Sequence, residues 1–89
     1  MMERHVTVGS SVGLHARPAA VFAKAAASQP VPVTIGKAGA DPVDARSVLS
    51  VIGLGARSGD EVVLSADGPD AERVLDELAE VVATDHDGS

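Results

Sequence analysis

EVVLSADGPDAERVLDELAEVV, residues 61–82, combines two periodicities on either side of one turn. In the first six residues, Val62, Leu64 and Ala66 alternate with other side chains, which predicts a strand. Asp67-Gly-Pro-Asp70 breaks the alternation and is predicted to cap a helix. The apolar stripe of that helix has acidic residues opposite it and consists of Ala71, Val74, Leu75, Leu78 and Val82. A strand that leads directly into an amphipathic helix indicates a domain of mixed α and β structure.

The same two periodicities predict the elements that precede this stretch. Alternation of side chains predicts two further strands, at 4–8 and 31–37, and the loop Lys37-Ala-Gly-Ala40 predicts a hairpin into a short strand at 42–45. An Ala-rich segment with Pro18 in its first turn predicts a helix over 16–28. Ser47 opens a second, short helix, which the glycines at 53 and 55 end. The order β-α-β-β-α-β-α indicates a two-layer α+β domain, an open-faced sandwich with helices on one face of an antiparallel sheet.

Length and composition limit the function classes. The 89 residues fit one domain, which we expect over 1–84 with a frayed tail over 85–89. The absence of Cys excludes disulfides and fits a cytoplasmic location, and no segment has the pattern of a signal peptide or a membrane span. A net charge of −6 argues against a nucleic-acid surface, so we expect protein partners and, by default, a monomer. We expect no metal site at Asp85-His86-Asp87, because no second set of ligands lies nearby in the sequence.

The segment Gly13-Leu-His-Ala-Arg-Pro-Ala19 lies between the first predicted strand and the first predicted helix. Because Pro18 fits a first helical turn, His15 should fall at or near the N-cap. The backbone N–H groups of Ala16 and Arg17 then lack helical partners and favour an anion, which the Arg17 guanidinium can also bind. Chemistry at His15 is one interpretation, and a capping or solvated histidine is the other.

These seven residues resemble the active-site signature of HPr, the family of histidine-containing phosphocarrier proteins of the phosphoenolpyruvate-dependent sugar phosphotransferase system. The resemblance extends along the chain to Ala83. It implies a four-stranded antiparallel sheet in the order 1-4-2-3, covered by three helices. It also implies His15 as the phosphoryl acceptor through Nδ1, with Arg17 as its partner.

The resemblance further implies the partners. Enzyme I would phosphorylate His15, and sugar-specific Enzyme IIA proteins would receive the phosphoryl group. The chain would then be a carrier and a substrate of Enzyme I rather than an enzyme, and it would need no cofactor.

Ser47 has two interpretations. It is a natural N-cap for the short helix, and it also aligns with the serine that a regulatory kinase, HPr Ser kinase/phosphorylase, phosphorylates in some family members. The sequence departs from those members at the next three positions, where Val48, Leu49 and Ser50 replace Ile, Met and Gly.

The short helix cannot bury apolar side chains on all sides, so part of it should be exposed. The resemblance implies that this helix and the start of the first helix form one docking face. The residues expected there are Val48, Leu49, Ile52, Ala20 and Lys24. Arg46 is expected at its rim, and Arg57 is given no role.

Two alternatives to a sugar carrier stay open. One is an HPr-like regulatory binding module that contacts a transcriptional regulator through the Ser47 region without phosphate on His15. The presence of both His15 and Arg17 argues against it. The other is a carrier in a nitrogen-related or dihydroxyacetone-type phosphorelay, which the motif does not separate from a sugar carrier.

Overall fold

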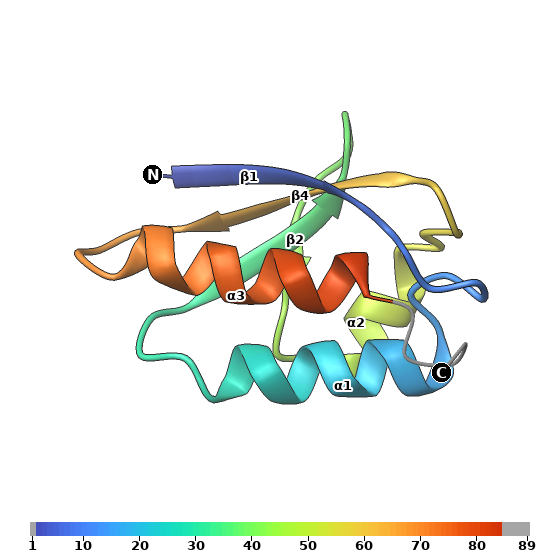
Figure 1. Cartoon of the computed structure of the whole chain (residues 1–89), viewed down its shortest axis with the longest axis horizontal. Helices are drawn as coiled ribbons and strands as arrows, with labels where there is room; N and C mark the ends of the chain where they lie inside the picture. Colours follow the sequence, from blue (N-terminus) through green and yellow to red (C-terminus); the bar gives the residue numbers. More distant parts are fainter. Residues whose placement is uncertain (1, 85–89) are drawn as a thin grey trace.

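The computed structural model describes residues 2–84 as one antiparallel sheet with its helices gathered on one face (Figure 1). The strands are β1 (Met2–Thr7), β2 (Val33–Lys37), β3 (Val43–Asp44) and β4 (Glu61–Ala66). The helices are α1 (Ala16–Ala27), α2 (Val48–Gly53) and α3 (Ala71–Ala83). The strands lie in the order β1-β4-β2-β3, which confirms the predicted fold class and topology.

β4 lies inside the sheet because it pairs antiparallel with both β1 and β2. Its alternation sets the register: Val62 pairs with Val6, and Leu64 pairs with Ile35. Val62 and Leu64 are fully buried, whereas Glu61 is exposed. The side-chain period of two therefore directs one set of β4 residues to the helices and leaves the other on the open face.

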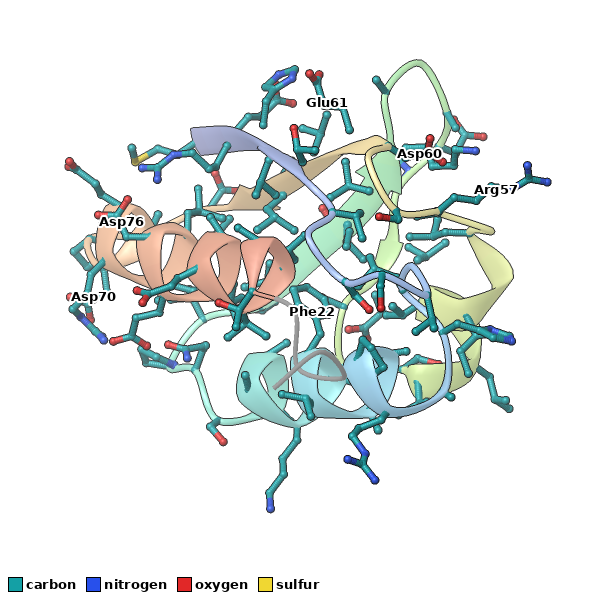
Figure 2. All side chains as sticks on the ribbon, turned by 45° about the vertical axis from the view of Figure 1, so that its right-hand side comes forward. Phe22, Arg57, Asp60, Glu61, Asp70 and Asp76 are labelled. Atoms are coloured by element: carbon teal, nitrogen blue, oxygen red, sulfur yellow. The ribbon has the colours of Figure 1, made fainter. Side chains whose placement is uncertain are left out.

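The core lies between this face of the sheet and the helices. The predicted stripe of α3 is buried along its whole length. Phe22 of α1, the one aromatic residue of the chain, is fully buried and lies in the interior of the molecule in Figure 2. α1 and α3 pack against each other beneath the sheet (Figure 1).

Some boundaries differ from the prediction. The strand expected from residue 31 begins at Val33, because Pro32 has no N–H to donate to a ladder. The first strand begins earlier than expected and ends at Thr7, but Val8 still exchanges backbone hydrogen bonds with Gly59 and Asp60.

The predicted capping role of Asp70 is wrong for its side chain. Asp70 occupies the N-cap position of α3 but makes no side-chain capping hydrogen bond, and its carboxylate lies 3.9 Å from the Arg73 guanidinium instead. The tail expected over 85–89 and the Asp85-His86-Asp87 cluster within it lie outside the described residues.

No helix within residues 2–84 is both long and apolar enough to cross a membrane. Nor do these residues bring together three or more His, Asp or Glu side chains that could hold a metal ion.

Candidate functional site

The loop between β1 and α1 is held on its inner side by hydrogen bonds. The Gly13 N–H donates to the Ser10 carbonyl at 3.1 Å, and the Leu14 N–H donates to the Ala56 carbonyl at 3.0 Å. The Val12 N–H donates to Ser10 Oγ at 3.3 Å. Ser10 and Leu14 are almost fully buried, so the loop is fastened to the interior while Val12 faces outward.

Gly13 is a point of close approach between this loop and residues 56–57. Its φ of +79° lies in the left-handed region that glycine adopts without steric cost. A Cβ atom at this position would lie 2.5 Å from the Ala56 carbonyl oxygen and 2.9 Å from Arg57 Cα. The loop can therefore pack against residues 56–57 only because residue 13 has no side chain.

His15 follows as the N-cap of α1. Its backbone is extended, with φ −140° and ψ 155°, and its N–H donates to the Gly13 carbonyl at 3.0 Å. The side chain is exposed and makes no capping hydrogen bond. The imidazole is thus accessible, and the interpretation of His15 as a side-chain cap is not supported.

The first residues of α1, which directly follow His15, have backbone N–H groups without partners in the described part of the chain. The N–H groups of Ala16 and Arg17 make no hydrogen bond outside the helix to any of residues 2–84, and Pro18 has no N–H. Free N–H groups and the positive end of the helix dipole both favour a negative charge.

Ala16 has a φ of +44°, a left-handed conformation that costs a non-glycine residue about 1 kcal/mol. Backbone strain therefore lies directly after His15.

α2 contacts α1 and presents apolar side chains to solvent. Val51 is fully buried, whereas Leu49 is 82% and Val48 37% exposed. Of the other residues expected on a docking face, Ile52 is half-buried, and Ala20 and Lys24 are exposed one helical turn apart on α1. The prediction that the short helix leaves apolar surface exposed is confirmed.

Ser47 caps α2. Its Oγ accepts a hydrogen bond from the Ser50 N–H at 3.2 Å, which confirms the capping interpretation.

Arg46, expected at the rim of the docking face, instead forms an ion pair with Asp44 in the turn that precedes α2. Its guanidinium donates to both carboxylate oxygens of Asp44, at 3.1 Å each, and its N–H donates to Oδ1 at 2.9 Å. These hydrogen bonds hold the pKa of the Asp44 carboxyl below its usual value. Those from the Arg46 side chain contribute most, and the one from its backbone N–H comes second.

Ser10 and Val12 are features that the sequence analysis missed. Ser10 is 1% exposed and accepts two of the hydrogen bonds that shape the loop. Val12 is 55% exposed, two residues before Leu14. The available signal was a branched apolar residue in a loop of Gly and Ser, Gly9-Ser-Ser-Val-Gly13.

Comparisons with known proteins point to one family. Residues 2–84 match the PTS-HPr family model, described as the PTS HPr component phosphorylation site. The chain is 54% identical to the phosphocarrier protein HPr of Streptomyces coelicolor over 83 residues, which cover 93% of this chain and 89% of that protein. It is 45% identical to the HPr of Haloferax volcanii, with 93% and 94% covered.

A solved structure gives the same result. The crystal structure of HPr from Bacillus anthracis superposes with a TM-score of 0.84 at 33% identity, covering 91% of this chain and 95% of that one. A family match over nearly the whole chain, close relatives and a shared topology lead to one conclusion. The chain belongs to the HPr family of phosphocarrier proteins of the phosphotransferase system.

Proposed function

We propose that His15 accepts a phosphoryl group from phospho-Enzyme I and donates it to sugar-specific Enzyme IIA proteins in the cytoplasm. The observation that carries this proposal is the exposed His15 imidazole beside the free N–H groups of Ala16 and Arg17. We propose a monomer as the default state of the carrier. It needs no cofactor, because the activated phosphoryl group arrives already bound to the donor.

The chemistry is a transfer between two nucleophiles. In neutral His15, Nε2 carries the proton and the Nδ1 lone pair attacks phosphorus. A bond forms between Nδ1 and phosphorus while the bond from phosphorus to the donor side chain breaks with its electron pair. The reverse sequence of bonds delivers the group to the acceptor.

The start of α1 holds the transferred group. The Ala16 and Arg17 N–H groups and the helix dipole bind the phosphoryl oxygens, and the Arg17 guanidinium neutralises their charge. The Ala16 and Arg17 N–H groups and the Arg17 guanidinium make no hydrogen bond or ion pair outside the helix within residues 2–84. The phosphoryl group therefore displaces no partner there when it binds them.

The proposal is tested by intact mass measurement after incubation with phosphoenolpyruvate and Enzyme I. The expected result is a gain of one phosphoryl group, which mild acid removes because phosphohistidine is acid-labile. A chain that gains no mass, or gains a group that survives acid, would overturn the proposal.

Arg17→Ala should leave the fold intact and slow phosphoryl transfer from Enzyme I by roughly 10- to 100-fold, the loss of one charge-assisted contact. The side chain is exposed and makes no hydrogen bond or ion pair among residues 2–84, so its removal breaks no polar interaction there. Arg73→Ala is the matched control, because Arg73 pairs with Asp70 and Glu77 on α3. Equal rates for the two variants would remove Arg17 from the mechanism.

We also propose that partners dock on Val48, Leu49, Ile52, Ala20 and Lys24, and that a phosphate on Ser47 weakens this docking. A dianion at the N-terminus of α2 is tolerated by the helix but puts charge next to the exposed side chains of Val48 and Leu49. Recognition by an HPr Ser kinase/phosphorylase would make Ser47 a regulatory position.

Two substitutions separate the capping role of Ser47 from the regulatory one. Ser47→Ala should lower the free energy of unfolding by about 1 kcal/mol and leave Enzyme I binding unchanged. Ser47→Asp should keep the cap and its stability yet weaken binding, because it adds charge. Urea unfolding and titration calorimetry measure the two effects, and unaltered Enzyme I affinity in Ser47→Asp would leave Ser47 with its capping role alone.

A further inference from the structure

The basic side chains divide into two groups. All seven Lys and Arg residues of the chain lie within residues 2–84. Four of them make ion pairs: Arg4 with Asp76, Lys37 with Asp60, Arg46 with Asp44, and Arg73 with Asp70 and Glu77. The three that pair with no carboxylate in this part of the chain are Arg17, Lys24 and Arg57. Two of these three already belong to the site proposed around His15, which draws attention to the third.

Arg57 adjoins the loop that carries His15. A Cβ on Gly13 would lie 2.9 Å from Arg57 Cα, and the Leu14 N–H donates to the carbonyl of the preceding residue, Ala56. The Arg57 side chain projects outward into solvent, at the end of the molecule opposite to Asp70 and Asp76 (Figure 2). The Arg57 main chain therefore lies against the loop that carries His15, and its side chain is exposed.

The nearby carboxylate of Asp60 fixes the backbone of Arg57 without pairing with its side chain. Asp60 Oδ2 accepts a hydrogen bond from the Arg57 N–H at 2.9 Å and lies 3.7 Å from Lys37 Nζ. The backbone hydrogen bond is the chief reason that the pKa of the Asp60 carboxyl lies below its usual value. The turn is thus anchored through the main chain, and the guanidinium is left available.

We propose that Arg57 binds carboxylates on an acidic surface of the phosphoryl donor protein and speeds the encounter that brings the donor to His15. The argument is charge complementarity. On a chain of net charge −6, Arg17, Lys24 and Arg57 are the cations that form no ion pair with a carboxylate of residues 2–84. The Asp60 carboxylate attracts the Arg57 charge without forming an ion pair with it, and a surface cation without an ion pair next to a site attracts an oppositely charged partner. This inference rests on the proposed function, since it assigns a further residue to the same transfer.

The test compares Arg57→Gln with Arg73→Gln, which removes a cation already paired on α3. The rate of phosphorylation by phospho-Enzyme I is measured below saturation, at about 0.05 M and about 0.5 M salt. Arg57→Gln should be roughly three- to tenfold slower than wild type at low salt and nearly equal to it at high salt, where screening removes the attraction. Arg57→Lys should recover most of the rate, and Arg73→Gln should match wild type at both salts.

A loss that is the same at both salt concentrations, or no loss at low salt, would overturn the role of Arg57. Urea unfolding of Arg57→Gln should match wild type, because the hydrogen bond to Asp60 comes from the backbone. The mass measurement separates this inference from the proposed function. A wild-type chain that gains no phosphoryl group refutes both, whereas a phosphorylated wild type with an unaffected Arg57→Gln refutes only the contact.

Discussion

His15→Ala is expected to abolish the acid-labile phosphoryl group that the wild-type chain gains from phosphoenolpyruvate and Enzyme I. The reason is chemical, since removal of the imidazole removes the nitrogen that bonds to phosphorus. Stability should change little, because the His15 side chain is exposed and makes no capping hydrogen bond. Intact mass spectrometry with and without mild acid measures the loss, and urea unfolding verifies that the variant is folded.

His5→Ala is the matched control. His5 is also an exposed histidine, but it lies on β1, with Nδ1 2.7 Å from Glu61 Oε2. Its ring is thus held by a carboxylate and has no helix N-terminus beside it. His5→Ala should gain the phosphoryl group as the wild type does. A phosphoryl group that persists in His15→Ala and disappears in His5→Ala would move the acceptor to the open face of the sheet.

Phosphorylation of these variants, together with transfer to an acceptor protein, distinguishes the alternatives that the sequence left open. A regulatory binding module would show no phosphoryl gain in any variant, including the wild type. A carrier for another phosphorelay would be phosphorylated on His15 but would not pass the group to sugar-specific Enzyme IIA proteins. Transfer from the phosphorylated chain to such an acceptor therefore separates the two kinds of carrier.

The elements that the sequence predicts best are those whose periodicity reflects burial. In α3 each of the five predicted stripe residues is buried, and β4 has the predicted bounds, because each element buries one face against the same core. The exposure of Val48 and Leu49 also follows from local reasoning, since α1 and β3 do not cover every apolar side of a helix of six residues.

The features of the site that sequence reasoning misses depend on contacts between distant segments. The role of Gly13 depends on Ala56 and Arg57, more than 40 residues away. Arg57 and Arg46 each lie next to a carboxylate but bind it differently. Arg57 donates to Asp60 through its backbone N–H, which leaves its guanidinium without an ion pair within residues 2–84, whereas the Arg46 guanidinium donates to Asp44. The periodicity of the sequence does not encode such pairings. Two arginines in turns can therefore have different partners, as Arg46 and Arg57 do.

Gly13→Ala is expected to destabilise the loop that carries His15 without touching the reacting nitrogen. Two costs add. A left-handed φ of +79° costs alanine about 1 kcal/mol, and the Cβ atom would meet the Ala56 carbonyl oxygen at 2.5 Å, so that the backbone must shift. We expect the free energy of unfolding to fall by about 2 to 4 kcal/mol in total, a large part of the stability of a domain of this size.

Gly39→Ala isolates the first of these costs. Gly39 has a φ of +83°, but nothing lies within 4 Å of the Cβ that alanine would add. This variant should lose only about 1 kcal/mol in urea unfolding. The difference between the two variants therefore measures the close approach of the loop to residues 56–57, and equal losses would contradict that approach.

Phosphoryl transfer should respond to Gly13→Ala even under conditions where the variant is folded. The His15 N–H bonds to the Gly13 carbonyl, so a shift of Gly13 moves the start of α1 and the imidazole with it. A displacement of about 1 Å at a reacting group costs on the order of 100-fold in rate. Gly39→Ala should transfer at the wild-type rate, because its loop connects β2 and β3 and bears none of the groups proposed to act at His15. A folded Gly13→Ala variant that transfers as fast as Gly39→Ala would mean that the packing of this loop does not position His15.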